Sequence, residues 1–403
     1  MKNILCVDLD QTLLARNDNI FILRSIDELC RSIQSMPDGQ CKSRMEAAIK
    51  KMIHRDTISQ TLYEVFLSEF CDGNEQDRQK IAADLLHYYD TEYHAMQQYT
   101  SIIPEGIQFV KEAVRKNFKI VIATNPIYPL NALQQRVQWA GLADMMDKFL
   151  FITTMEDFHF TKPDPAYYVE ILGRLAWPED TRVVMIGDSL EMDIIPASRA
   201  GIPGYWLGDG LLPDGLNPFC ANGTYDGIFP WIEQINEQPE AALSQNTGLD
   251  LLAHLKTTPA VFDSICRSVT EKTGCSRPEI SEWSLVEIIC HLRDMDRDVN
   301  ISRFVEVFQQ ENPFISHIDT SSWAEDRKYR EENGHEAAQE FIDNRLKLID
   351  LLAEHQDEWY EKTARHSIFG PVCVADLIQF IVTHDRMHIR QAYDTLERVR
   401  SIT

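Results

Sequence analysis

Gly187-Asp-Ser-Leu-Glu-Met-Asp193 is the stretch that decides the fold when it is read together with Asp8-Leu-Asp-Gln-Thr12 near the start of the chain. Each stretch follows a short apolar run, at residues 4–7 and 183–186. Such runs are typical of strands that are buried on both faces of a parallel sheet. Ligands of open α/β sheets bind outside the carboxyl ends of the strands. We therefore expect the carboxylates of both stretches to converge on one crevice.

The chemistry of these residues indicates a phosphate-handling metal site. Clustered carboxylates repel one another, and a hard cation such as Mg²⁺ relieves this by accepting their oxygens. A third apolar run, at 119–123, ends in Thr124 and Asn125, and Lys162 lies in a Thr-Lys-Pro-Asp-Pro loop. A hydroxyl and an ammonium group suit the oxygens of a transferring phosphoryl group. Asp-x-Asp alone is common on loops, so the prediction depends on all four segments together.

The four segments in this order resemble the haloacid dehalogenase superfamily of phosphohydrolases, over about residues 1 to 235. The resemblance implies that Asp8 is the nucleophile that forms an aspartyl-phosphate and that Asp10 is the general acid and base. It implies that Thr124 and Lys162 hold the phosphoryl oxygens, with Asn125 in support. Members that displace halide from carbon lack the second aspartate, so Asp10 favours a phosphatase over a dehalogenase.

The resemblance also implies the ligands of the magnesium ion. Asp8, Asp188 and Asp193 would contribute carboxylates and Asp10 its backbone carbonyl, with Ser189 in support. The long helical segment between Asp10 and Thr124 exceeds a plain loop, and it resembles the helical cap of this superfamily at about residues 15–100. Such a cap would cover the site and select the substrate.

A polar stretch at residues 236–248, which carries Pro and Gly, predicts a domain boundary near residue 245. The expected domains are 1–240, an α/β parallel sheet of Rossmann-like type with the cap, and 249–403, an all-α four-helix bundle. The four helices are expected at about 249–273, 284–310, 336–355 and 374–400. Ser284 and Glu287 form a capping-box pattern at the start of the second helix.

Three histidines of the second domain form a candidate metal site. His384 and His388 lie four residues apart, on one face of the last helix, and His291 lies in the second helix. Three imidazoles suit Zn²⁺, Ni²⁺ or a similar ion with positions left for water or substrate. The pattern around them resembles the DinB superfamily of four-helix metalloproteins over about 249–403, which implies these three ligands, with Gln391 one turn later. That superfamily includes thiol-dependent transferases and isomerases.

Composition limits the possible partners. The chain has 403 residues, 44% hydrophobic and 25% charged, with a net charge of -24 that disfavours nucleic acid as a ligand. It has no apolar run long enough to span a membrane. The nine cysteines lack Cys-x-x-Cys spacing, which predicts reduced thiols and a cytoplasmic protein.

These patterns predict a Mg²⁺-dependent phosphatase for a small phosphorylated metabolite, fused to a DinB-like domain that catalyses a second step such as thiol or small-molecule transfer, with a low-molecular-weight thiol as candidate co-substrate. One alternative makes the bundle only a binding or dimerisation module, so that the protein is a homodimer. A second alternative is a capped phosphomutase, which moves phosphate between sugar positions.

Overall fold

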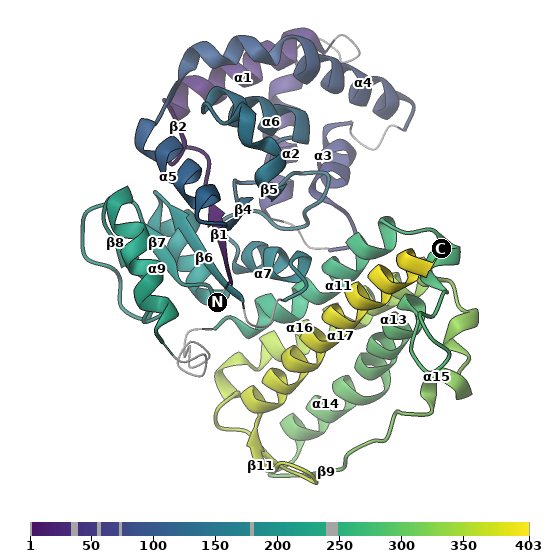
Figure 1. The fold of residues 1–403 in the computed structure, drawn as a ribbon. Helices are drawn as coiled ribbons and strands as arrows, with labels where there is room; N and C mark the ends of the chain where they lie inside the picture. The colour runs from purple at the N-terminus through teal and green to yellow at the C-terminus, as the bar shows by residue number, and fades with distance from the viewer. Residues whose placement is uncertain are drawn as a thin grey trace. The chain divides into compact units, whose positions relative to one another are not determined.

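The computed structural model describes residues 2–33, 39–54, 58–71, 75–177, 181–238 and 249–402. It divides into two compact units (Figure 1). The first comprises Met1–Tyr168 and Glu179–Leu249, and the second comprises Val169–Pro178 and Asp250–Thr403. The boundary predicted near residue 245 lies outside the described residues. No described helix combines the length and the apolar character that a membrane span requires.

The first unit is built on a six-stranded, wholly parallel sheet of order β5-β4-β1-β6-β7-β8. The strands are β1 Lys2–Val7, β4 Lys119–Ile122, β5 Phe149–Ile152, β6 Thr181–Gly187, β7 Gly204–Trp206 and β8 Ala221–Asn222. The helices between the strands in sequence are α5 Pro104–Arg115, α6 Leu130–Trp139, α7 Pro165–Arg174, α8 Ile195–Arg199 and α9 Ile228–Asn236, and α7 belongs to the second unit from Val169 onward. Short turns lie at Ala143–Lys148, Leu190–Ile194 and Tyr225–Gly227. The central strand β1 is fully apolar from Leu5 to Val7 and completely buried there, as the sequence predicts for a parallel sheet.

A helical insertion interrupts the first unit directly after β1. It begins and ends at a two-stranded antiparallel sheet, β2 Leu14–Arg16 with β3 Thr100–Ile102. Between these strands lie α1 Asp18–Ser32, α2 Cys41–Ile53, α3 Leu62–Phe70, α4 Glu75–Thr91 and a 3₁₀ turn at Tyr93–Tyr99. We refer to residues 14–102 as the cap. A capping box at Thr61 and Glu64 fixes the start of α3.

Two cysteines of the cap form a disulfide, which corrects the expectation that all nine are reduced thiols. Cys30 in α1 and Cys41 at the start of α2 are bonded, with their Cα atoms 5.6 Å apart. The other seven cysteines, all among the described residues, are not disulfide-bonded, and Cys6 and Cys290 are completely buried core residues, as expected from their apolar surroundings. Because the paired residues are 11 positions apart and on different helices, no Cys-x-x-Cys spacing marks them.

The second unit is a helical bundle, as predicted. Its long helices are α11 Leu251–Arg267, α13 Leu285–Asp294, α14 Ile301–Gln309, α16 Gly334–Glu354 and α17 Val374–Ile402. A π-helical turn at Met295–Asn300 joins α13 to α14, so the single helix expected at 284–310 is interrupted by a bulge. The shorter elements are α12 Glu271–Gly274, α15 Trp323–Asp326, the 3₁₀ turns Tyr329–Glu331 and Gln356–Glu358, and a small sheet of β9 Phe314–Ile315, β10 Thr363–His366 and β11 Gly370–Cys373.

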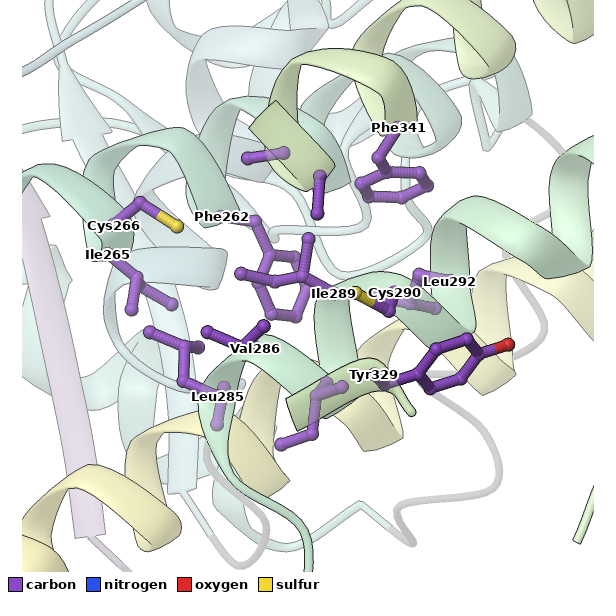
Figure 2. Packing of buried hydrophobic residues seen from close by; sticks show 14 of the residues in the cluster. Phe262, Ile265, Cys266, Leu285, Val286, Ile289, Cys290, Leu292, Tyr329 and Phe341 are labelled. Atoms are coloured by element: carbon purple, nitrogen blue, oxygen red, sulfur yellow. The ribbon is translucent and has the colours of Figure 1, made fainter. Parts of the chain in front are cut away.

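The core of this bundle is a cluster of interlocking apolar side chains (Figure 2). Phe262 of α11 and Phe341 of α16 meet edge to face, with ring centroids 6.3 Å apart. Ile289 and Cys290 of α13 lie beside them and are completely buried. The predicted capping box starts α13, because the Ser284 hydroxyl accepts a hydrogen bond from the Glu287 amide and the Glu287 carboxylate accepts one from the Ser284 amide. The apolar cluster and the capping box together hold α13, the helix that carries His291, in place.

Candidate active site and metal centre

The carboxyl ends of β1, β4 and β6 bring the predicted residues of the first unit to one edge of the sheet. The Asp8 amide donates to the carbonyl of Ile186 at 3.0 Å, and the Ala123 amide donates to the carbonyl of Val7 at 2.8 Å. Asp8, Thr124 and Asp188 therefore follow three neighbouring strands at the same end. The strand order reverses around β1, and this switch point is where α/β sheets open a crevice for ligands.

Lys162 links two of the carboxylates directly. Its Nζ lies 2.6 Å from Oδ1 of Asp8 and 2.6 Å from Oδ1 of Asp193. Oxygens of Asp8, Asp188 and Asp193 all lie within 4.8 Å of one another. This is the carboxylate cluster that the sequence predicts, and one ammonium group is inserted into it.

The charge of the cluster is only partly compensated. Burial raises the pKa of Asp8 to about 8, against the lowering effect of Lys162, and Asp193 adds to the rise. Burial and Asp193 also raise the pKa of Asp188 to about 6. Asp193 and Asp8 hold the pKa of Lys162 above its usual value although burial opposes this, so Lys162 stays an ammonium. An excess of buried negative charge favours binding of a divalent cation at these oxygens.

Local structure fixes the two carboxylates that follow β6. The Thr12 hydroxyl donates to Oδ1 of Asp188 at 3.3 Å, and the Ser189 amide donates to Oδ2 of Asp193 at 3.1 Å. A Cβ atom at Gly187 would lie 2.3 Å from Oδ2 of Asp193, so this position admits only glycine without a shift. The indole of Trp206 donates to the Asp188 carbonyl at 2.8 Å, a contact that nothing in the sequence pattern indicated.

Thr124 and Asn125 take supporting places in the described structure. Thr124 is buried, and its carbonyl accepts hydrogen bonds from the Thr153 hydroxyl at 2.6 Å and the Tyr167 hydroxyl at 2.8 Å. Oδ1 of Asn125 accepts from the backbone amide of Lys162 at 3.3 Å. Asn125 therefore positions the lysine loop.

Asp10 differs sharply from Asp8, although only one residue separates them. Oδ2 of Asp10 pairs with Nη2 of Arg16 at 3.0 Å and with the guanidinium of Arg136. These two arginines, Arg136 first, hold the pKa of Asp10 below its usual value although burial opposes this. A carboxylate in this form can accept a proton from water, whereas it cannot donate one while both arginines remain paired with it. No motif indicated Arg136, because it lies inside an ordinary helical pattern in α6.

The three predicted histidines of the second unit converge. Nε2 of His384 lies 3.3 Å from Nε2 of His291 and 3.1 Å from Nε2 of His388. Burial lowers the pKa of His291 to about 3 and that of His388 to about 4, and the neighbouring imidazoles add to this. The rings are therefore neutral, which is the form that binds a metal. Three ring nitrogens aimed at one point fit a transition-metal ion.

The surroundings of the three histidines orient the ring of His388. Nδ1 of His388 lies 2.8 Å from Oε1 of Gln391, so a proton on Nδ1 would leave Nε2 free for a metal. The indole of Trp283 is parallel to the His388 ring, with centroids 6.1 Å apart. Asp294 and Asp385, the carboxylates nearest to the histidines in sequence, pair instead with arginines, Asp294 with Arg293, Arg297 and Arg327 and Asp385 with Arg345.

Comparisons with known proteins agree with both units. The sequence model described as haloacid dehalogenase-like hydrolase matches residues 5–206, half of the chain, and that of the DinB superfamily matches residues 254–392. Pyrimidine 5'-nucleotidase YjjG of Escherichia coli is 32% identical over 115 residues, 28% of this chain and 48% of that protein. Glyceraldehyde 3-phosphate phosphatase of Methanopyrus kandleri is 28% identical over 133 residues, 32% of this chain and 52% of that protein.

This chain thus spans about half the length of each of these two relatives. Among solved structures, YfiT of Bacillus subtilis, a four-helix bundle of unusual topology, is similar over 38% of this chain and 85% of that chain, with 18% identity and a TM-score of 0.34. The family match rests on the sequence segment that contains β1, the cap, β4 and β6, where the carboxylates and Lys162 meet. The chain belongs to the haloacid dehalogenase-like hydrolases and carries a DinB-like bundle at its carboxyl end.

Proposed function

We propose that the first unit is a Mg²⁺-dependent phosphatase that hydrolyses a small phosphorylated metabolite through an aspartyl-phosphate on Asp8. The observation that carries this proposal is the position of Lys162, whose ammonium lies 2.6 Å from both Asp8 and Asp193. An anionic phosphoryl group placed against Asp8 would find this ammonium beside it, with Thr124 at the end of the adjacent strand. Attack by the Asp8 carboxylate would divide one difficult displacement into two easier steps.

Asp8, Asp188 and Asp193, with the Asp10 carbonyl, are the proposed ligands of Mg²⁺. Their carboxylate oxygens lie close enough for one ion to bind them together, and hard oxygen ligands suit this cation. When bound, Mg²⁺ would neutralise charge on the phosphoryl oxygens. Asp10, held as a carboxylate by its arginines, would accept the proton of the water that hydrolyses the aspartyl-phosphate. Protonation of the leaving group by Asp10 would require that its pairing with Arg16 and Arg136 be loosened.

The test is phosphate release from a panel of phosphorylated metabolites, with and without Mg²⁺, by the wild type, Asp8→Asn and the exposed control Asp209→Asn. We expect Mg²⁺-dependent release by the wild type and the control, and a loss of at least a thousandfold in Asp8→Asn without loss of folding, as expected for a residue that forms the covalent intermediate. Turnover near the wild-type rate in Asp8→Asn would remove Asp8 as nucleophile. An isomeric product without free phosphate would favour the mutase alternative.

For the second unit we propose a Zn²⁺ or Ni²⁺ site at His291, His384 and His388 that catalyses transfer of a thiol or another small molecule. The supporting observation is the convergence of the three Nε2 atoms beside Trp283. Catalytic sites typically use three protein ligands and leave one position open. The alternative, a binding or dimerisation module, predicts that these histidines affect association only.

Metal content, oligomeric state and thiol consumption separate these alternatives. The variants are His388→Ala and, as control, the exposed His335→Ala. Under the proposal, the wild type and His335→Ala carry one transition-metal ion per chain, and His388→Ala loses both the ion and thiol-dependent turnover while its mass in solution is unchanged. A wild type without stoichiometric metal, or a His388→Ala variant that changes only its oligomeric state, would favour the module.

A further inference from the structure

The cap contains a cavity that the proposed chemistry does not yet use. Its volume is about 190 Å³, and it lies among α1, α2, α3 and α4 and the loop after β4. Most of its lining is aliphatic or aromatic, including Leu29, Met45, Phe66, Leu85 and Tyr128. An apolar cavity of about 150 Å³ already accommodates benzene. The cap cavity therefore has room for one aromatic ring with a small substituent.

One residue connects this cavity to the catalytic carboxylates. Arg16 belongs to its lining, and the same guanidinium lies 3.0 Å from Oδ2 of Asp10. Arg136, which also pairs with Asp10, stacks over the ring of Tyr128 on the cavity wall, 5.0 Å from its centroid. A molecule in the cavity is therefore separated from Asp10, the proposed general acid and base, by the side chain of Arg16.

The lining offers few partners to a polar guest. Its polar side chains belong to Arg16, Ser25 and three tyrosines at positions 63, 89 and 128. The guanidinium of Arg16 is already paired with Asp10. Burial raises the pKa of Tyr63 and Tyr89, so their hydroxyls are neutral. A sugar in this cavity would lose water from several hydroxyls with few replacements, and unreplaced hydrogen bonds are costly to bury.

We propose that this cavity receives the alcohol part of the substrate, and that the substrate is a phosphate monoester of an apolar alcohol about the size of one substituted aromatic ring. The inference rests on the proposed phosphatase function and names the substrate class of that site. Apolar surface leaving water favours such a guest, whereas a polyol gains little there. Exposed apolar side chains of α1 and α4, Ile22 and Leu86, belong to the lining and would meet the guest first.

The test compares three phosphates with the full chain and Mg²⁺. Benzyl phosphate and glucose 6-phosphate both release a primary alcohol, so they differ mainly in the polarity of the group attached to the phosphate. In acetyl phosphate this group is too small to fill the cavity. The variants are Ile22→Asp and Leu86→Asp, both in the cavity lining, and Leu23→Asp, a neighbour on α1 that is 65% exposed and outside the lining. All three positions are exposed, so folding should be retained.

We expect kcat/KM for benzyl phosphate to exceed that for glucose 6-phosphate at least tenfold. Ile22→Asp and Leu86→Asp should each lower the benzyl phosphate value at least tenfold, mainly through KM, and change the acetyl phosphate value less than twofold. Leu23→Asp should change neither. Equal kcat/KM values for benzyl phosphate and glucose 6-phosphate would overturn the inference. An unchanged benzyl phosphate value in both Ile22→Asp and Leu86→Asp would also overturn it. In either case, hydrolysis of acetyl phosphate would still uphold the phosphatase. If the wild type releases no phosphate from any of the three compounds, both the inference and the proposed phosphatase function are overturned.

Discussion

Replacement of Arg345 with methionine should destabilise the bundle by about 4 kcal/mol at pH 7. Arg345 of α16 is 1% exposed and forms bonds with two carboxylates, Asp296 through Nε at 2.6 Å and Asp385 through Nη1 at 2.5 Å. Asp296 follows the helix that carries His291, and Asp385 lies beside His384 in α17. The guanidinium therefore cross-links the two helices that supply the proposed metal ligands.

Two independent estimates give this magnitude. Removing one partner of a buried ion pair costs about 3 to 5 kcal/mol. The variant can instead neutralise one carboxyl by binding a proton, which at pH 7 costs about 1.4 kcal/mol for each pH unit above an ordinary carboxyl pKa near 4, or about 4 kcal/mol. The variant is destabilised by the smaller of these two free energies. Because both are about 4 kcal/mol, this is the destabilisation that we expect.

The second route also predicts the sign of the pH dependence. Without the guanidinium, the folded variant holds a carboxyl whose pKa is raised above its unfolded value, so the folded state binds more protons than the unfolded state between the two values. Stability of the variant relative to the wild type should therefore improve as the pH falls, by about 1.4 kcal/mol per unit down to about pH 5. In the wild type, burial already raises the pKa of Asp296, against the opposing effect of Arg345.

Hydrogen exchange of α16 and α17 peptides, followed by mass spectrometry in the full chain, measures the bundle separately from the first unit. The matched control is Arg365→Met in β10, an exposed arginine whose loss should cost under about 0.5 kcal/mol. Transition-metal content of the same samples tests the cross-link, since loosened helices should bind the ion more weakly. A cost below about 1 kcal/mol at pH 7, or one that grows as the pH falls, would refute this reasoning.

Two further predictions concern other parts of the chain. Cys30→Ser with Cys41→Ser should lower the stability of the cap by about 3 kcal/mol, because the disulfide closes a short loop between α1 and α2; dithiothreitol should lower the melting temperature of the wild type but not of the double variant, and a wild type indifferent to reductant would contradict the bond. Arg277→Met should cost about 3 kcal/mol at pH 7, because the side chain of Glu287 is completely buried. Although burial opposes this, Arg277 and the capping bonds hold the pKa of Glu287 below its usual value, so the stability they provide is present above the unfolded pKa and fades as the pH falls through the folded one. Urea denaturation at pH 7 and pH 4 checks this, with Glu287→Gln as control, and an equal cost of Arg277→Met at both pH values would count against it.

The features that sequence could predict are those encoded locally. Apolar runs followed by Asp8 and Asp188 identified strand ends, and the four-residue step from His384 to His388 identified one helical face. The capping box at Ser284 follows from residue types three positions apart. Such signals depend on backbone periodicity, which is the same wherever the segment lies in the fold.

The features that sequence could not predict arise from contacts between distant segments. No glycine or proline marks the π-helical turns at Leu190–Ile194 and Met295–Asn300 in the sequence. The Cys30–Cys41 bond links two helices across residues that lie outside the described structure. The cap cavity likewise consists of side chains from four helices, from β2 and from the loops after β4 and β5, and its apolar character appears only when these are assembled.

The pair Asp8 and Asp10 shows why this distinction matters for function. The two aspartates are the same residue type one position apart, but burial raises the pKa of Asp8, whereas Arg136 and Arg16 lower that of Asp10 although burial opposes this. Neighbouring carboxyl groups whose pKa values are driven apart are suited to different tasks. Lys162 lies against Asp8, which would receive the phosphoryl group, whereas Arg16, one partner of Asp10, belongs to the lining of the cap cavity, where the alcohol would leave. Because Asp8 must be ionised to attack, its assignment as nucleophile rests on the ammonium of Lys162 beside it and not on its raised pKa.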